Sequence, residues 1–233
     1  MIDRPASRPA IDLCLDTARS DPQKARAYAE EWVSRTEGLQ RATGRHCLGV
    51  AAGNQGDWAA AASAFLAARD EADDIGFKGR MGALAGSALL ADARPAEALA
   101  ELDTARASAV GNAGLSGAIA MDRAAALVAL DRPGDAAAAL AEARGMVPGD
   151  VQAWLLSATL ARRQGDLATA QQQIERAAAI DPRDPAVGLE AGVIAALGGR
   201  DDAARQSFAS VIAAAPDSPQ AATAKAYLAQ LGG

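Results

Sequence analysis

Residues 151–184 read VQAWLLSATLARRQGDLATAQQQIERAAAIDPRD. Asp150 comes just before this stretch, and its carboxylate can accept hydrogen bonds from the exposed backbone N–H groups that begin a helix. Small and apolar residues then follow at helical spacing from Trp154 to Ala161. Gly165-Asp166 supplies a turn and a second cap, and Pro182 ends a second helix. The stretch therefore predicts two antiparallel helices joined by a tight turn.

The same pattern recurs along the chain at a fixed interval. Pro148, Pro182 and Pro216 are each 34 residues apart (182 − 148 and 216 − 182). Three further columns keep this phase: a small residue at Ala124, Ala158, Gly192 and Ala226, an alanine at Ala136, Ala170 and Ala204, and a bulky residue at Leu140, Ile174 and Phe208. With longer intervals, they continue towards the N-terminus at Gly86 and Gly49, at Ala98, Ala61 and Ala25, and at Leu102 and Phe65. A sustained period of this length indicates a repeat array.

We expect one all-helical solenoid over residues 6–233, made of six helix pairs and a last unpaired helix. The predicted units are 6–41, 42–78, 79–116, 117–150, 151–184 and 185–218, with a capping helix at 219–231. No unit can bury its apolar face alone, so its stability comes from contacts with its neighbours. Residues 1–5 are expected to be disordered.

The residues of this period resemble the tetratricopeptide repeat signature, including its length. In the unit at 151–184 the matching residues are Trp154, Ala158, Gly165, Ala170, Ile174, Ala177 and Pro182. In the unit that starts at Ala42 they are Leu48-Gly49, Gly56-Asp57-Trp58, Ala61, Phe65 and Ala68. The resemblance implies a bacterial-type protein of about six repeats, folded as an α–α superhelix: a right-handed solenoid of antiparallel helix pairs. Leu13, Asp73 and Val110 depart from the pattern.

Composition argues against several classes of function. The formal net charge is -6 and no basic run occurs, whereas a nucleic-acid binder needs a cationic surface. No apolar stretch reaches the roughly 18 residues of a membrane span. His46 is the single histidine, and the chain has no Cys-x-x-Cys, His-Glu-x-x-His or calcium-loop motif. We therefore expect no catalytic residue, no metal and no cofactor, and a protein that is not an enzyme.

Two cysteines, Cys14 and Cys47, fall in the first helices of consecutive predicted units. One interpretation is a pair of small buried apolar side chains. The other is a disulfide, which would imply an oxidising compartment and a removed signal peptide. The two Cα atoms must lie within about 7 Å of each other for a bond to form. The N-terminus as written has no apolar signal core, so the expected location is the cytoplasm, with the periplasm as the alternative.

The resemblance also implies a concave groove lined by the first helix of each unit. Its inward candidates are His46, Val50, Arg80, Ala83, Ser87, Met121, Ala125, Val128, Leu155, Thr159, Arg162, Leu189, Val193 and Tyr227. The alternative is that these side chains pack against one another. Arg162 can also be read, with Arg163, as a solvated helix end.

Met121, Leu155, Leu189 and Val193 make the middle of this groove apolar. The expected partner is therefore a protein or peptide with an apolar or amphipathic segment. The expected function is that of a non-catalytic scaffold or adaptor. The alternatives are a self-associating structural protein, which would form a homo-oligomer, and a periplasmic assembly factor.

Overall fold

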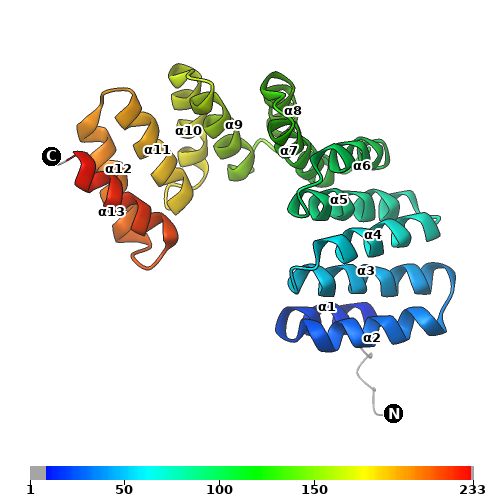
Figure 1. Cartoon of the computed structure of the whole chain (residues 1–233). Coiled ribbons are helices and arrows are strands. Elements are labelled where there is room, and N and C mark those ends of the chain that lie inside the picture. The colour runs from blue at the N-terminus through cyan, green and yellow to red at the C-terminus, as the bar shows by residue number, and fades with distance from the viewer. Residues whose placement is uncertain (1–8, 232–233) are drawn as a thin grey trace, which may run out of the picture. The chain divides into compact units, whose positions relative to one another are not determined.

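The computed structural model describes residues 9–231, which form thirteen helices and no strand. The expected disordered residues 1–5 lie outside this range. In chain order the helices are α1 (Ala10–Ser20), α2 (Pro22–Arg35), α3 (Gly38–Asn54), α4 (Trp58–Glu71), α5 (Ile75–Ala91), α6 (Pro95–Ser108), α7 (Ala113–Ala129), α8 (Pro133–Met146), α9 (Val151–Arg163), α10 (Leu167–Ile180), α11 (Pro185–Leu197), α12 (Asp201–Ala214) and α13 (Pro219–Leu231) (Figure 1). The predicted all-α solenoid of helix pairs is confirmed.

The chain divides into two compact units between Arg132 and Pro133. Unit 1 contains α1–α7 and unit 2 contains α8–α13. None of the helices within residues 9–231 combines the length and the apolar character that crossing a membrane requires.

Aspartate side chains begin many of the helices. Asp150 accepts hydrogen bonds from the backbone N–H groups of Gln152 and Ala153, as predicted. The predicted cap at Asp166 is confirmed too, and Asp21, Asp57, Asp74 and Asp184 do the same at α2, α4, α5 and α11. These contacts satisfy N–H groups that have no partner inside the helix, and each stabilises its helix start by about 1 kcal/mol.

The first helices of the middle repeats are longer than those of unit 2. Helices α3, α5 and α7 each have 17 residues, whereas α9 and α11 have 13. They begin at Gly38, Ile75 and Ala113, about one helical turn before the unit starts that the 34-residue phase predicts. In the longer units the extra residues therefore extend the first helix at its N-terminus instead of lengthening a loop.

The repeated columns form the core of each unit. All five alanines of the column from Ala61 to Ala204 are fully buried, and Phe65, Leu102, Leu140, Ile174 and Phe208 are at most 5% exposed. The bulky column is therefore buried in every one of these repeats. A Cβ atom added at Gly49, Gly86 or Gly192 would collide with the bulky residue of the same repeat. The small residue on the first helix of a repeat therefore leaves the space that the bulky residue on its second helix fills.

The last helix covers the end of unit 2. Ala221 and Ala224 are fully buried against α11 and α12. The Tyr227 ring stacks on Phe208, with ring centroids 5.2 Å apart and planes 8° from parallel. Helix α13 therefore closes the apolar face that α12 would otherwise expose.

Candidate functional site

In unit 1, two first-helix residues, His46 and Arg80, lie beside the aromatic rings of Phe65 on α4 and Phe77 on α5. The His46 ring lies 6.3 Å from the rings of both Phe65 and Phe77, and its burial lowers the pKa of the imidazole, with the charge of Arg80 acting in the same direction. The exposed Arg80 guanidinium lies 5.8 Å from the centre of the Phe77 ring. His46 and Arg80 were candidates from the sequence, but Phe77 was missed, since no repeat column passes through it.

The same face holds a carboxyl group that sequence reasoning did not find. Ser87, on α5, donates a hydrogen bond to the carboxylate of Asp122, on α7. Burial raises the pKa of Asp122, and the hydrogen bond from Ser87 only partly opposes this shift. Within residues 9–231, no cation forms an ion pair with it. A desolvated carboxylate without a countercharge is typical of functional positions more than of structural ones.

We expect Asp122→Asn to stabilise the fold at neutral pH. The amide oxygen can still accept the Ser87 hydrogen bond, but no charge is desolvated. A carboxyl group whose pKa is raised by folding favours the folded state fully below its unfolded value of 3.8, and this contribution is lost as pH rises through the folded pKa. The variant should therefore show a higher urea midpoint than wild type at pH 7. The difference should disappear near pH 3.

The exposed Asp73, changed to Asn, is the control and should leave the midpoint unchanged at both pH values. A lower midpoint for Asp122→Asn at pH 7 would show that the charge itself is stabilising.

In unit 2, Arg162 forms an ion pair instead of facing solvent. Its Nε and Nη2 atoms donate to the two carboxylate oxygens of Glu190, on α11, at 2.6 and 3.3 Å. Glu190 is only 9% exposed. This bidentate contact joins two consecutive first helices, so the interpretation of Arg162 as a solvated helix end is wrong.

The apolar strip expected in the groove is partly used by the core. Leu155 is 9% exposed and packs in the core of α9–α11. Leu189 and Val193 are half-buried and pack beside Phe208 and α13. Met121 belongs to unit 1, where it is half-buried. Of the other inward candidates, Ala83 is buried, Val50, Thr159 and Tyr227 are half-buried, and Ala125 and Val128 are exposed.

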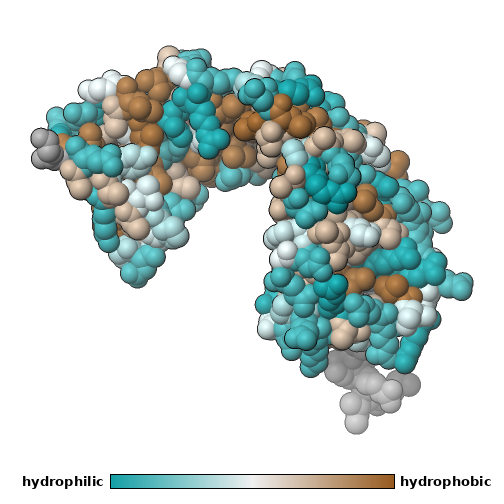
Figure 2. Space-filling view, in the orientation of Figure 1, coloured by the Kyte–Doolittle hydropathy of each residue, from teal (hydrophilic) through white to brown (hydrophobic). Residues whose placement is uncertain are grey.

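The surface as a whole mixes apolar and polar areas. On the side shown in Figure 2, brown patches alternate with hydrophilic surface in both units. Several large apolar side chains are exposed at helix ends or loops, and Val110 is the most open of them at 87%.

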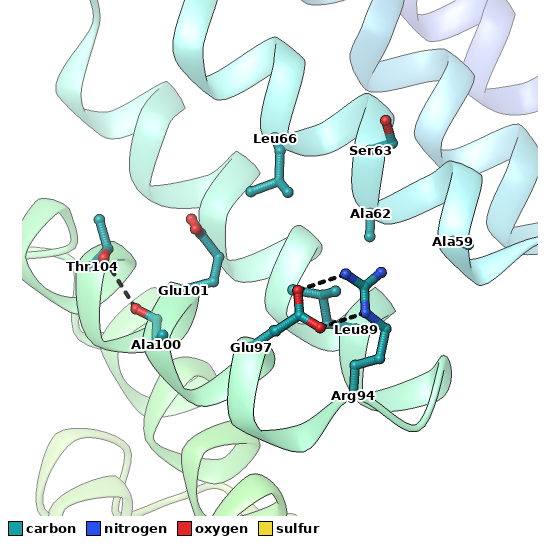
Figure 3. A pocket seen from close by; sticks show the side chains of 10 residues that line it. All are labelled: Ala59, Ala62, Ser63, Leu66, Leu89, Arg94, Glu97, Ala100, Glu101 and Thr104. Carbon is teal, nitrogen blue, oxygen red and sulfur yellow. Dashed lines mark hydrogen bonds and ion pairs between the residues drawn. The ribbon is translucent and has the colours of Figure 1, made fainter.

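A pocket of about 570 Å³ lies between the second helices α4 and α6 of unit 1 (Figure 3). Ala62, Leu66 and Leu89 line its apolar part. Arg94 and Glu97 form a two-fold ion pair at one end, with contacts of 2.7 and 2.6 Å. A second pocket, of about 210 Å³, lies between α8 and α10 of unit 2. Neither pocket contains a histidine or cysteine.

The two cysteines are joined in a disulfide, with their Cα atoms 6.1 Å apart. The bond links α1 to α3, and both cysteines are buried beside Ala29 and Trp32. Within the described range, no group of three or more histidine, cysteine, aspartate or glutamate side chains is placed to hold a metal ion.

Comparisons with known proteins agree on the repeat. Family models described as tetratricopeptide repeat match residues 121–185 and 161–228. No curated protein matches the sequence. The structure of PilW, described as a widely conserved type IV pilus biogenesis factor, is similar with a TM-score of 0.77 at 19% identity, over 91% of this chain and 95% of that chain.

Two other solved structures are similar along most of the chain. PilF of Pseudomonas aeruginosa has a TM-score of 0.73 at 16% identity, over 93% of this chain and 95% of that one. YrrB, described as a TPR protein with an unusual peptide-binding site, has a TM-score of 0.57 at 18% identity, over 93% and 98%. At these identities the similarity establishes the fold alone.

Proposed function

Because the chain belongs to the tetratricopeptide repeat family, we propose that it is a non-catalytic scaffold that binds another polypeptide on the face of its first helices. The fold is that of protein-interaction scaffolds. The proposal rests on the cationic and apolar side chains that are exposed together on this face in unit 1. Arg80 is exposed over the Phe77 ring, and Val128 is 37% exposed on α7.

The chemistry of this face suits an apolar or amphipathic segment. Val128 and the half-buried Met121 offer apolar contact in unit 1, as Leu189 and Val193 do in unit 2. Arg80 can orient a polar group of the partner, since charges at the edge of an interface mainly set register and rate of association. A polypeptide ligand also agrees with YrrB, a protein of the same fold that is described as having a peptide-binding site.

We expect Val128→Glu to abolish capture of the partner, because a charge placed on an apolar contact must be desolvated without compensation. The measurement is affinity chromatography of a lysate from the source cell, with proteins identified by mass spectrometry. Val110→Glu makes the same chemical change at a more exposed position outside the first helices, and it is the matched control. Leu155 is not suitable for this test, since a glutamate there would bury a charge in the core and unfold the repeat.

Equal helical content in all proteins by circular dichroism is required for the comparison. If Val128→Glu retains every partner that wild type captures, the first-helix face is not the binding surface. A mass that increases with concentration in the absence of a partner would favour the alternative, a self-associating structural protein.

The bond between Cys14 and Cys47 supports a second proposal, that the chain works in an oxidising compartment such as the periplasm. This differs from the cytoplasmic location expected from the sequence as written. Thiol alkylation of the protein in intact source cells tests it: alkylated cysteines would place it in a reducing compartment.

A further inference from the structure

The two pockets occupy the same place in the repeat. In the second helix of one repeat, Arg69 follows Phe65 as Arg144 follows Leu140, four residues later. In the second helix of the next repeat, Glu101 precedes Leu102 as Gln173 precedes Ile174. The pocket between α4 and α6 therefore corresponds to the pocket between α8 and α10, with Arg69 matching Arg144 and Glu101 matching Gln173.

In unit 1 the arginine and the acid pair with each other. Arg69 donates to the Glu101 carboxylate across the boundary between repeats, and the two side chains are only 23% and 12% exposed. The hydrogen bond to Glu101 is the main reason that the pKa of Arg69 is raised. A pair of this kind balances the charge that each partner brings into a poorly hydrated site.

In unit 2 a glutamine stands at the position of the acid that pairs with the arginine in unit 1. Arg144 is half-buried, donates to the hydroxyl of Ser157 and lies 5.2 Å from the centre of the Trp154 ring. Within residues 9–231, no carboxylate pairs with it. Gln173 stands where the acid would be, and its Oε1 atom is buried without a hydrogen-bond partner. Burial accordingly lowers the pKa of Arg144, which is opposite to the shift at Arg69.

We propose that the pocket between α8 and α10 binds a carboxylate group, which takes the place beside Arg144 that Glu101 takes beside Arg69. Arg144, Ser157 and Gln173 all line this pocket. A guanidinium matches a carboxylate with two parallel N–H donors, and the contact is stronger where water is excluded. The free Gln173 oxygen adds a requirement for a donor, so the preferred ligand carries an N–H group next to its carboxylate.

The charge of the pocket selects against a phosphate. Asp166 lines it too, and hydrogen bonds from Thr169 lower the pKa of this carboxyl group, so the pocket holds one cation and one anion. A bound carboxylate gives this pocket one net negative charge, whereas a phosphate dianion would give it two and would be repelled more strongly by Asp166. The volume of about 210 Å³ accommodates a small acid or the carboxylate of one residue of a polypeptide.

This site is separate from the first-helix face of the proposed function, and either can fail without the other. The test uses the full chain, labelled with nitrogen-15, and follows amide resonances of α8–α10 and the indole N–H of Trp154 during titration at constant ionic strength. Three probes differ by one group each: acetate, N-acetylglycine and N-acetylglycinamide. We expect N-acetylglycine to bind with saturation and N-acetylglycinamide not to bind.

Acetate distinguishes the two sources of the carboxylate. Weaker binding of acetate than of N-acetylglycine supports a polypeptide carboxylate with its neighbouring N–H group. Equal binding of both supports the carboxylate site and assigns it to free small acids.

The decisive variant is Gln173→Glu, which copies the Arg69–Glu101 pair into unit 2. It should weaken N-acetylglycine binding by about tenfold or more, because the introduced carboxylate then pairs with Arg144 and competes with the ligand. Arg144→Gln should weaken binding similarly by removing the cation. Gln172→Glu adds the same charge at the neighbouring exposed position of α10 and should leave affinity within about twofold.

Two results would overturn the proposal. One is the absence of saturable shifts with either carboxylate. The other is an affinity for N-acetylglycine that Gln173→Glu and Arg144→Gln both leave unchanged while their spectra remain those of the folded chain.

Discussion

Phe208→Ala is expected to lower the free energy of unfolding by about 3–5 kcal/mol. The Phe208 ring is 0% exposed, stacks on Tyr227 and fills the space above Gly192. Truncation removes these contacts, and the backbone at Gly192 offers no side chain that could fill the cavity. The measurement is urea unfolding followed by circular dichroism. Leu197→Ala, at a position 58% exposed, is the surface control and should change stability by less than about 1 kcal/mol.

A double-mutant cycle can show whether Gly192 and Phe208 interact directly or whether each substitution only weakens packing in general. Gly192→Ala alone should destabilise by about 1–3 kcal/mol, because the added Cβ collides with a buried ring that cannot move away. Combined with Phe208→Ile, it recreates the pair of Ala158 and Ile174 from the preceding repeat. The double variant should therefore be more stable than the sum of the two single effects. Additive effects would contradict direct packing of the Phe208 ring against Gly192.

Removal of the bond between Cys14 and Cys47 is expected to destabilise the N-terminal repeats by about 3–4 kcal/mol. The bond closes a loop with a sequence separation of 33 and thereby restricts the unfolded chain. Its loss should act mainly on α1 and α2, since a helix in a repeat array contacts only its neighbours. Hydrogen exchange should show faster exchange in these two helices after Cys14→Ala and Cys47→Ala, while amides of α9–α13 keep their protection.

Reductant provides the control for this prediction. It should reproduce the effect in the wild-type chain and have no effect on the double alanine variant. Unchanged protection of α1 and α2 in both cases would show that packing alone holds the first repeat in place.

Most of the fold was predictable because the repeat makes each position visible several times. Phe208 alone could be any apolar residue, but its column with Ile174 and Leu140 identifies a buried position in three repeats at once. The extra turn of α3, α5 and α7 was not predictable by the same means. Those residues occur outside the shared 34-residue phase, and nothing in a column says whether an insertion lengthens a helix or a loop.

The candidate site was less predictable, because it depends on contacts between helices. Leu155 reads as an inward apolar residue, and only the structure shows that α11 helps to cover it. Arg162 reads as the end of a helix until Glu190 is placed beside it. Asp122 and Arg144 carry no signal of their own in the sequence. The difference between Glu101 and Gln173 is visible when the repeats are aligned, but its meaning requires knowledge of which arginine faces each residue.

The correspondence of these two boundaries has an evolutionary consequence. Glutamate and glutamine codons differ by a single nucleotide. One point mutation can therefore replace the glutamate of an ion pair between two repeats by glutamine and leave the arginine without its acidic partner. Duplication of a repeat copies both states, after which each copy can change independently. An array built in this way can acquire recognition at one boundary while ion pairs elsewhere, such as Arg69–Glu101, preserve its cohesion.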